Sequence, residues 1–137
     1  MKWYTDEFIK KIPKTDLHLH LDGSLRIPTL IELAKSQKVE LPSYTEEGLR
    51  ELVFKKSYNN LDEYLKGFAH TYAVMRDKES IERISYELAL DCFEEGVRYI
   101  EVRFAPQLLM TDNLGFEDIV TAADKGLKRA REEINMK

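Results

Sequence analysis

Apolar residues recur at two different spacings along the chain. In residues 14–22, Leu17, Leu19 and Leu21 alternate with polar residues, which is the period of a β-strand with two different faces. A second strand is predicted over residues 97–106, where β-branched and aromatic residues are followed by a proline. The sequence therefore predicts two strands that are far apart along the chain.

Helical periodicity dominates the rest of the sequence. Shorter helices are predicted over residues 28–37, with Pro28 in the first turn, and 45–55, and a helical turn precedes the first strand. In three further segments, apolar residues recur every three or four positions and would form an apolar stripe along one side of a helix. The stripes are Leu61, Leu65, Phe68, Tyr72 and Met75; Ile81, Ile84, Leu88 and Cys92; Phe116, Ile119, Ala123, Leu127, Ala130 and Ile134. The order of strand, helices, strand and helix predicts an α/β fold with parallel strands covered by helices.

Two parallel strands do not make a stable sheet on their own. The sequence ends at Lys137, where a third strand would be expected. No repeat, linker or low-complexity tract divides the chain, so we expect residues 1–137 to form the N-terminal part of one larger domain without an internal boundary. The exposed edge of such a sheet is expected to promote self-association.

Composition narrows the possible partners and location. Of the 137 residues, 43% are apolar and 34% are charged, and the net charge of −4 opposes binding to nucleic acid or to an anionic membrane. One cysteine excludes an internal disulfide. The polar start is not a secretory signal, and no apolar run approaches the ~20 residues of a membrane helix. We therefore expect a cytoplasmic protein.

The first predicted strand carries the candidate chemistry. His18, His20 and Asp22 occupy alternate positions, so their side chains point to one face at intervals of about 6.6 Å. Two imidazoles at this spacing can lean onto one metal ion, with zinc–nitrogen distances of about 2.0–2.1 Å. Asp16 lies one step earlier on the same expected face, where its carboxylate could orient a ligand ring.

A metal-free alternative is open at this point. His18 and His20 could be half-buried strand histidines that bond to the backbone or to Asp16, since His-x-His is a short pattern. The cost of burying two histidines and two carboxylates on one face favours a compensating cation. Two ligands do not complete a zinc site, and the third histidine, His70, lies off its helical stripe and is expected at the surface.

The second strand also has two faces. Glu101 and Arg103 share one face, opposite Ile100, Val102 and Phe104. We expect these three apolar residues to meet the helices and the charged pair to face the barrel interior, where an ion pair would be structural and hold neighbouring strands. Cys92 lies on a helical stripe and is expected to be a small core residue.

The segment "PKTDLHLHLDGSL" closely resembles the opening signature of the adenosine deaminases, zinc enzymes of the amidohydrolase class built on a (β/α)8 barrel. The segment "LDEYLKGFAHTYAVM" resembles the part of those enzymes that covers the substrate. The segment "EGVRYIEVRFAPQLL" is similar to their second barrel strand. The resemblance implies a partial (β/α)8 TIM barrel, containing the first two strands and their helices.

The resemblance also implies roles for single residues. His18 and His20 match the first two ligands of one zinc ion, and His20 and Asp22 match residues of the nucleoside site, with Asp22 in reach of the ribose. Three further residues match the helix that shields the purine in those enzymes: Leu61, Leu65 and Phe68. Ordinary helix packing is the alternative for those three, because a stripe at helical spacing usually packs into a core.

The activity implied is the hydrolytic deamination of adenosine or deoxyadenosine, a small-molecule purine nucleoside, to inosine or deoxyinosine. The remaining zinc ligands and the acid/base glutamate are expected after Lys137, so no catalytic residue is assigned in this chain and we expect it to be inactive alone. A deaminase of adenine or of a modified adenosine is an alternative within the family. A non-catalytic binding module that retains the first barrel strand is an alternative from another class.

Overall fold

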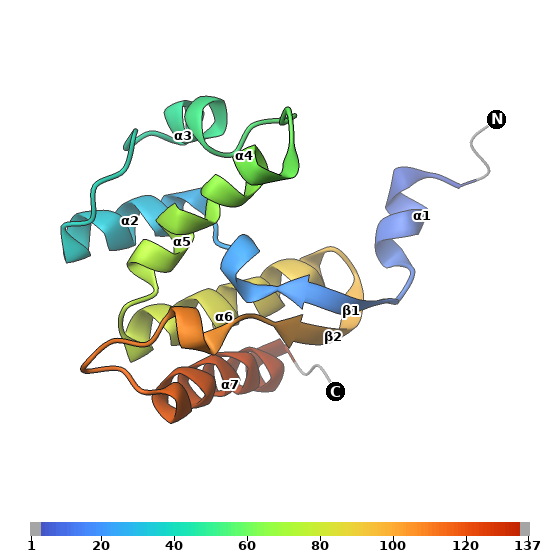
Figure 1. The fold of residues 1–137 in the computed structure, drawn as a ribbon. Helices are drawn as coiled ribbons and strands as arrows, with labels where there is room; N and C mark the ends of the chain where they lie inside the picture. Colours follow the sequence, from blue (N-terminus) through green and yellow to red (C-terminus); the bar gives the residue numbers. More distant parts are fainter. Residues whose placement is uncertain (1–3, 135–137) are drawn as a thin grey trace.

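The computed structural model describes residues 4–134 (Figure 1). Its helices and strands follow the predicted order, and two short 3-10 turns, η1 and η2, follow the two strands. In chain order the elements are α1 (Asp6–Lys11), β1 (Lys14–His20), η1 (Leu21–Gly23), α2 (Ile27–Gln37), α3 (Glu46–Leu52), α4 (Leu61–Lys66), α5 (Phe68–Val74), α6 (Lys78–Glu94), β2 (Val97–Arg103), η2 (Pro106–Leu108) and α7 (Phe116–Ile134).

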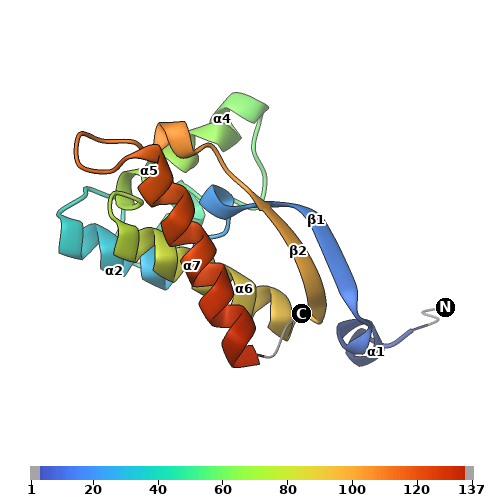
Figure 2. The same ribbon diagram turned by 90° about the horizontal axis from the view of Figure 1, so that it is seen from below.

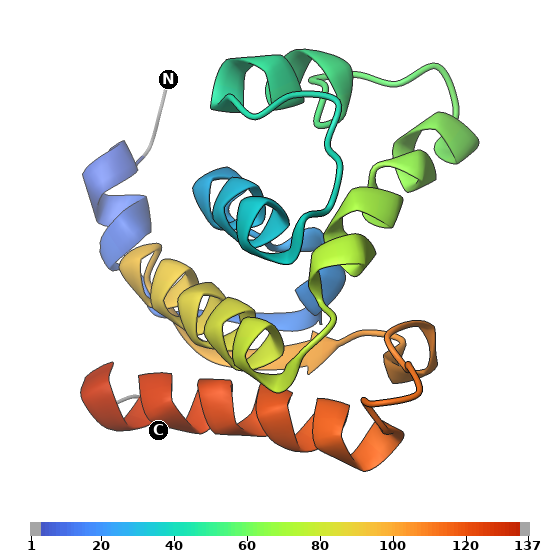
Figure 3. The ribbon, with the colours of Figure 1, turned by 90° about the vertical axis from the view of Figure 1, so that its left-hand side faces the viewer.

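The two strands pair in parallel, as the sequence predicts. Helix α6 packs against β2, and α7 packs along α6 (Figures 2 and 3). Helices α2 to α5 gather beyond the carboxyl end of β1, whereas α1 lies at its amino end and projects away from the other helices (Figure 1). The α/β architecture matches the N-terminal part of a TIM-barrel fold.

One apolar core lies between the helices and the covered face of the sheet. Ile84 of α6, Ile119 of α7 and Leu30 of α2 are among its almost fully buried side chains. Gly126 allows the close approach of α7 to α6, because a Cβ atom there would lie 2.2 Å from the carbonyl oxygen of Glu82. Among the described residues, no helix is both long enough and apolar enough to cross a membrane.

Strand β1 differs from its predicted form because it contains a bulge. Asp16 pairs with Ile100 and Leu19 pairs with Val102, so three steps along β1 match two steps along β2. The extra residue breaks the alternation of faces, and Leu17 is 57% exposed instead of packing on the helices. The strand also ends at His20, two residues earlier than predicted, because residues 21–23 turn into η1.

Two other predicted elements have different limits. The stripe over residues 61–75 forms two helices, α4 and α5, because the chain tightens at Gly67, whose amide donates to the Tyr64 carbonyl at 3.2 Å. Strand β2 was expected to extend to residue 106 but ends at Arg103, because the chain turns into η2 at Pro106. Gly96 ends α6 with φ of 86°, a conformation that favours glycine.

Candidate metal centre and substrate pocket

The two histidines of β1 converge on one point. The Nε2 atoms of His18 and His20 lie 3.2 Å apart, with ring centroids 5.1 Å apart and an interplanar angle of 32°. Both residues are exposed on the face of the sheet opposite α6. The bulge therefore preserves the predicted approach of the two rings, although it changes the faces of the residues before them.

The separation of the two nitrogens fits a zinc ion. Two nitrogen ligands at about 2.0–2.1 Å from a tetrahedral zinc ion lie about 3.3–3.4 Å apart. The observed 3.2 Å is close to this value, and it also suits a hydrogen bond in which one Nε2 donates to the other. Among residues 4–134, no group of three or more histidine, cysteine or acidic side chains is placed to hold a metal, so the described residues do not form a complete tetrahedral site.

Asp22 lies in η1 and is only 3% exposed. Its Oδ2 accepts a hydrogen bond from the Tyr72 hydroxyl at 2.5 Å. Its Oδ1 lies 3.4 Å from Nδ1 of His20 and is buried without a hydrogen-bond partner among the described residues. A buried, unsatisfied oxygen carries a cost of about 1–3 kcal/mol, which a donor from a bound molecule would relieve.

Asp16 does not take the predicted place beside the histidine rings. The bulge puts it on the face of Ile100, towards the helices, where its negative charge contributes to raising the pKa of Cys92. Its Oδ1 accepts a hydrogen bond from the backbone amide of His18 at 3.1 Å. Asp16 therefore supports the bulged backbone rather than a ligand ring.

A pocket of about 440 Å³ opens beside these residues, between the carboxyl ends of the strands and the segment α4–α5. It is lined by His20, Asp22, Leu65, Phe68, Tyr72, Arg103, Phe104 and Ala105. Two of the three predicted covering residues, Leu65 and Phe68, therefore lie in its wall. Leu61 does not line it and is 66% exposed at the start of α4.

Four lining residues were not assigned to the site from the sequence. Arg103 is the last residue of β2, Phe104 and Ala105 follow it directly, and the register pairs Arg103 with His20. This pairing follows from the parallel sheet and could have been inferred by aligning the two strand ends. Tyr72 lies on a helical stripe that reads as ordinary core, and its contact with Asp22 joins residues 50 positions apart.

The charged pair of β2 faces the side of the sheet that α6 leaves open. Glu101 and Arg103 are both exposed there, opposite the half-buried Ile100 and Val102, as predicted. In the described part of the chain, the hydrogen-bond partner of Glu101 is the Tyr99 hydroxyl, at 3.0 Å. The expected structural ion pair is therefore absent from the described residues, and Arg103 belongs to the pocket wall.

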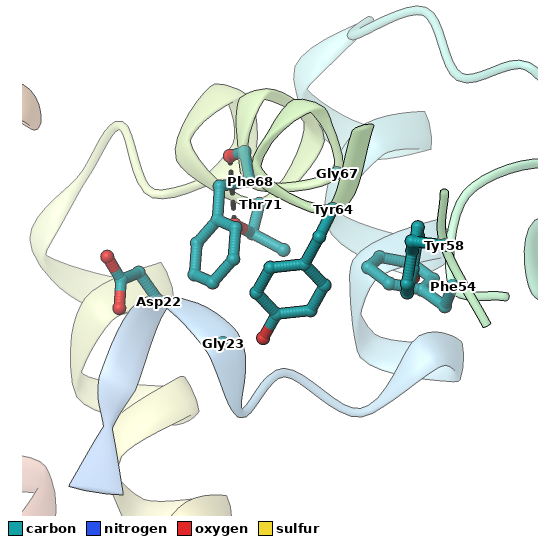
Figure 4. A pocket seen from close by; sticks show the side chains of 8 residues that line it. All are labelled: Asp22, Gly23, Phe54, Tyr58, Tyr64, Gly67, Phe68 and Thr71. Carbon is teal, nitrogen blue, oxygen red and sulfur yellow. Dashed lines mark hydrogen bonds between the residues drawn. The ribbon is translucent and has the colours of Figure 1, made fainter. Parts of the chain in front are cut away.

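A second, smaller pocket of about 130 Å³ shares Asp22 and Phe68 with the first pocket (Figure 4). Its wall is aromatic and comprises Phe54, Tyr58, Tyr64 and Phe68 together with Asp22, Gly23, Gly67 and Thr71. The rings of Tyr58, Tyr64 and Phe68 meet edge to face, at centroid distances of 5.2 and 5.6 Å. This aromatic cluster supports the segment that carries Leu65 and Phe68.

The remaining candidate residues lie away from the pocket. Cys92 is buried in the core as expected, and burial is the main reason why its pKa rises to about 11. His70 on α5 is half-buried, where the sequence predicted an exposed residue.

The sequence model described as "Adenosine deaminase" matches residues 13–137. The chain belongs to the adenosine deaminase family. The adenosine deaminase of Vibrio atlanticus is 46% identical over 126 residues, which cover 92% of this chain and 38% of that protein. An adenosine deaminase of Clostridium botulinum is 43% identical over 129 residues, which cover 93% of this chain and 39% of that protein. The chain thus spans less than half the length of these relatives.

Two solved structures share the fold of this chain. The N6-mAMP deaminase of Arabidopsis superposes with a TM-score of 0.73 at 30% identity, covering 92% of this chain and 37% of that one. An amidohydrolase from Burkholderia ambifaria, whose structure holds bound Zn, superposes with a TM-score of 0.78 at 20% identity, covering 96% of this chain and 35% of that one. The second likeness concerns the fold alone.

Proposed function

We propose that this chain supplies part of the active site of a zinc-dependent deaminase that acts on adenosine or deoxyadenosine. The observation that carries the proposal is the convergence of His18 Nε2 and His20 Nε2, 3.2 Å apart, beside a pocket that contains a buried carboxylate. Relatives named adenosine deaminase are 43% and 46% identical to the chain, and this favours adenosine over other purines.

In the proposed site, each residue of the chain has a limited task. His18 and His20 hold zinc through Nε2. When bound, zinc supplies an activated water molecule at neutral pH for attack on C6 of the purine. Asp22 Oδ1 accepts a hydrogen bond from a ribose hydroxyl, which satisfies the oxygen that is unpartnered here. Leu65 and Phe68 exclude water and so strengthen the polar contacts in the site.

The proposed domain is a single barrel to which residues 1–137 contribute the N-terminal part. Two histidines leave a zinc site incomplete, and proton transfer to the purine requires a further carboxyl group. We therefore expect the 137-residue chain to show no deaminase activity alone. The two-stranded sheet leaves backbone groups at its edges, and we expect the isolated chain to associate through them.

A deaminase of a modified adenosine monophosphate is the second candidate. Arg103 lines the pocket, and an arginine guanidinium can bind phosphate through two parallel hydrogen bonds, that is, as a bidentate donor. The structure named as an N6-mAMP deaminase is 30% identical to the chain, lower than the adenosine deaminases named above. This candidate predicts that Arg103→Gln impairs turnover of a nucleotide more than turnover of a nucleoside.

The test is a chimaera in which residues 1–137 replace the corresponding part of the Vibrio atlanticus adenosine deaminase. Loss of ultraviolet absorbance should report deamination of adenosine, and adenine and N6-methyl-AMP are assayed in parallel. We expect adenosine to be the best substrate and His18→Ala or His20→Ala to abolish turnover. A folded chimaera that prefers adenine or N6-methyl-AMP would overturn the substrate, and one that binds no zinc would favour a non-catalytic binding module.

A further inference from the structure

Tyr72 makes a short hydrogen bond to the buried carboxylate of the pocket. It lies on α5, and its hydroxyl donates to Oδ2 of Asp22 in η1 at 2.5 Å. Burial and the bond to Asp22 raise the pKa of Tyr72 to about 12, so the hydroxyl keeps its proton at neutral pH. The contact thus joins the segment that carries Phe68 to the turn that follows the metal-ligand strand.

This bond orients the carboxylate of Asp22 relative to His20. With Oδ2 held by the tyrosine, Oδ1 remains 3.4 Å from Nδ1 of His20. Polar contacts in ligand-free sites are often long and shorten when the ligand binds. The two oxygens of a carboxylate are equivalent, so the bond matters because it fixes the orientation of the group: with one oxygen on the Tyr72 hydroxyl, the other lies beside the His20 ring.

The position of Oδ1 has a consequence for the other nitrogen of the ring. A neutral imidazole carries one proton, and the hydrogen bond made by one nitrogen decides which nitrogen keeps its lone pair. If Nδ1 of His20 donates towards Asp22, Nε2 presents a lone pair. That Nε2 is the atom that lies 3.2 Å from Nε2 of His18.

We propose that Tyr72 is a positioning residue of the metal centre. Its hydroxyl holds Asp22 so that Oδ1 keeps the proton of His20 on Nδ1 and leaves Nε2 free to bind a divalent cation. Oδ1 retains a second lone pair for a substrate hydroxyl. The inference rests on the proposed metal site, and it links that site to α5, whose Phe68 ring packs beside Tyr72 at a centroid distance of 6.2 Å.

The histidine tautomers in the metal-free chain give a test that does not depend on activity. Nitrogen-15 NMR at neutral pH distinguishes a protonated ring nitrogen from one with a lone pair. In the unaltered chain we expect His20 with its proton on Nδ1. His18 should then carry its proton on Nε2, because one of the two close Nε2 atoms must donate. A wild-type His20 protonated on Nε2 would overturn the proposal.

Tyr72→Phe removes the hydroxyl and keeps the ring. We expect the variant to mix the two tautomers of His20 and to weaken zinc binding, measured by competition with a coloured chelator, about tenfold, the lower end of the range for partners of metal ligands. Asp22→Asn should act in the same direction. Tyr72→Phe should add nothing further in the Asp22→Asn background, since the tyrosine acts through the carboxylate.

Tyr58→Phe is the matched control. Its hydroxyl donates to the Val53 carbonyl at 2.9 Å in the neighbouring aromatic cluster and does not contact Asp22. We expect this control to leave the His20 tautomer and zinc affinity unchanged. The proposal fails if folded Tyr72→Phe keeps both readouts of the wild type, or if Tyr58→Phe changes them equally. If His18→Ala and His20→Ala leave the zinc affinity unchanged, the proposed metal site is itself wrong.

Discussion

On the side of the sheet that α6 covers, Val97 and Ile84 are buried in an apolar core, whereas on the opposite side His18, His20 and Glu101 are exposed to solvent. The covered side is closed by helices whose apolar residues interlock. On the open side, the rings of His18 and His20 approach each other, and His20 and Arg103 line the pocket. The buried apolar side chains and the exposed polar side chains therefore lie on different faces of the same two strands.

The largest expected effect comes from removing a side chain on the covered side. Ile119 is 0% exposed, and Ile119→Ala should reduce the free energy of unfolding by about 2–5 kcal/mol, because lost burial and the resulting cavity both contribute. Leu17→Ala, at a position 57% exposed on β1, should change it by less than about 0.5 kcal/mol. Urea denaturation followed by circular dichroism measures both, and equal losses would contradict the division between the two faces.

A smaller effect is expected from adding one methyl group between α6 and α7. Gly126→Ala places a Cβ atom 2.2 Å from the carbonyl oxygen of Glu82. Overpacking of this kind costs about 1–3 kcal/mol, and it opposes the gain of about 1 kcal/mol that alanine brings to a helix. We expect a net loss of stability.

Gly115→Ala is the control for that prediction, because a Cβ atom there meets nothing within 4 Å. Thermal unfolding should show a lower Tm for Gly126→Ala than for Gly115→Ala. A more stable Gly126→Ala variant would mean that the two helices can separate without cost.

On the open side, we expect a substitution to alter binding without altering the fold. His18→Ala should weaken zinc binding by at least about tenfold. Removing a residue that only hydrogen-bonds to a metal ligand already lowers metal affinity by about tenfold or more, and His18 is proposed as a ligand itself. The free energy of unfolding should change by less than about 0.5 kcal/mol, because the side chain is exposed. His70→Ala is the control for zinc binding, measured by calorimetry. A His70 effect as large as that of His18 would refute the proposed pair.

The local pattern of β1 predicts the meeting of His18 and His20, because strand periodicity places both rings on one face. The same pattern misplaces Asp16, since a bulge shifts the register and no local signal in the sequence marks it. Periodicity assumes a regular ladder, so it fails at the residues where pairing is irregular. Periodicity can thus predict the position of one side chain correctly while the predicted position of the side chain two residues away is wrong.

The contact between Tyr72 and Asp22 illustrates a second limit. It joins residues 50 positions apart, and the spacing of Tyr72 is that of any core residue on a helix. Arg103 was assigned to a structural ion pair because buried charges need partners, yet it is exposed at the end of β2. Long-range geometry and actual burial decided both roles, and neither is encoded in local spacing.

The smallest expected effect concerns the segment that covers the pocket. A hydrogen bond from the backbone amide of Asn59, followed by bonds from Lys55 and the Asn59 side chain, lowers the pKa of Glu63 from 4.5 to about 2. Because the folded pKa is depressed, this stabilisation of α4 is fully present above pH 4.5 and is lost as the pH falls towards 2. Carbon-13 NMR of the carboxyl group should show the low pKa directly. The difference in unfolding free energy between the wild type and Glu63→Gln should vanish as the pH falls from 4.5 to about 2.

Glu51→Gln, at an exposed position, is the control for this prediction. A stability difference between the wild type and Glu63→Gln that persists at about pH 2 would exclude the ionisation of Glu63 as its source.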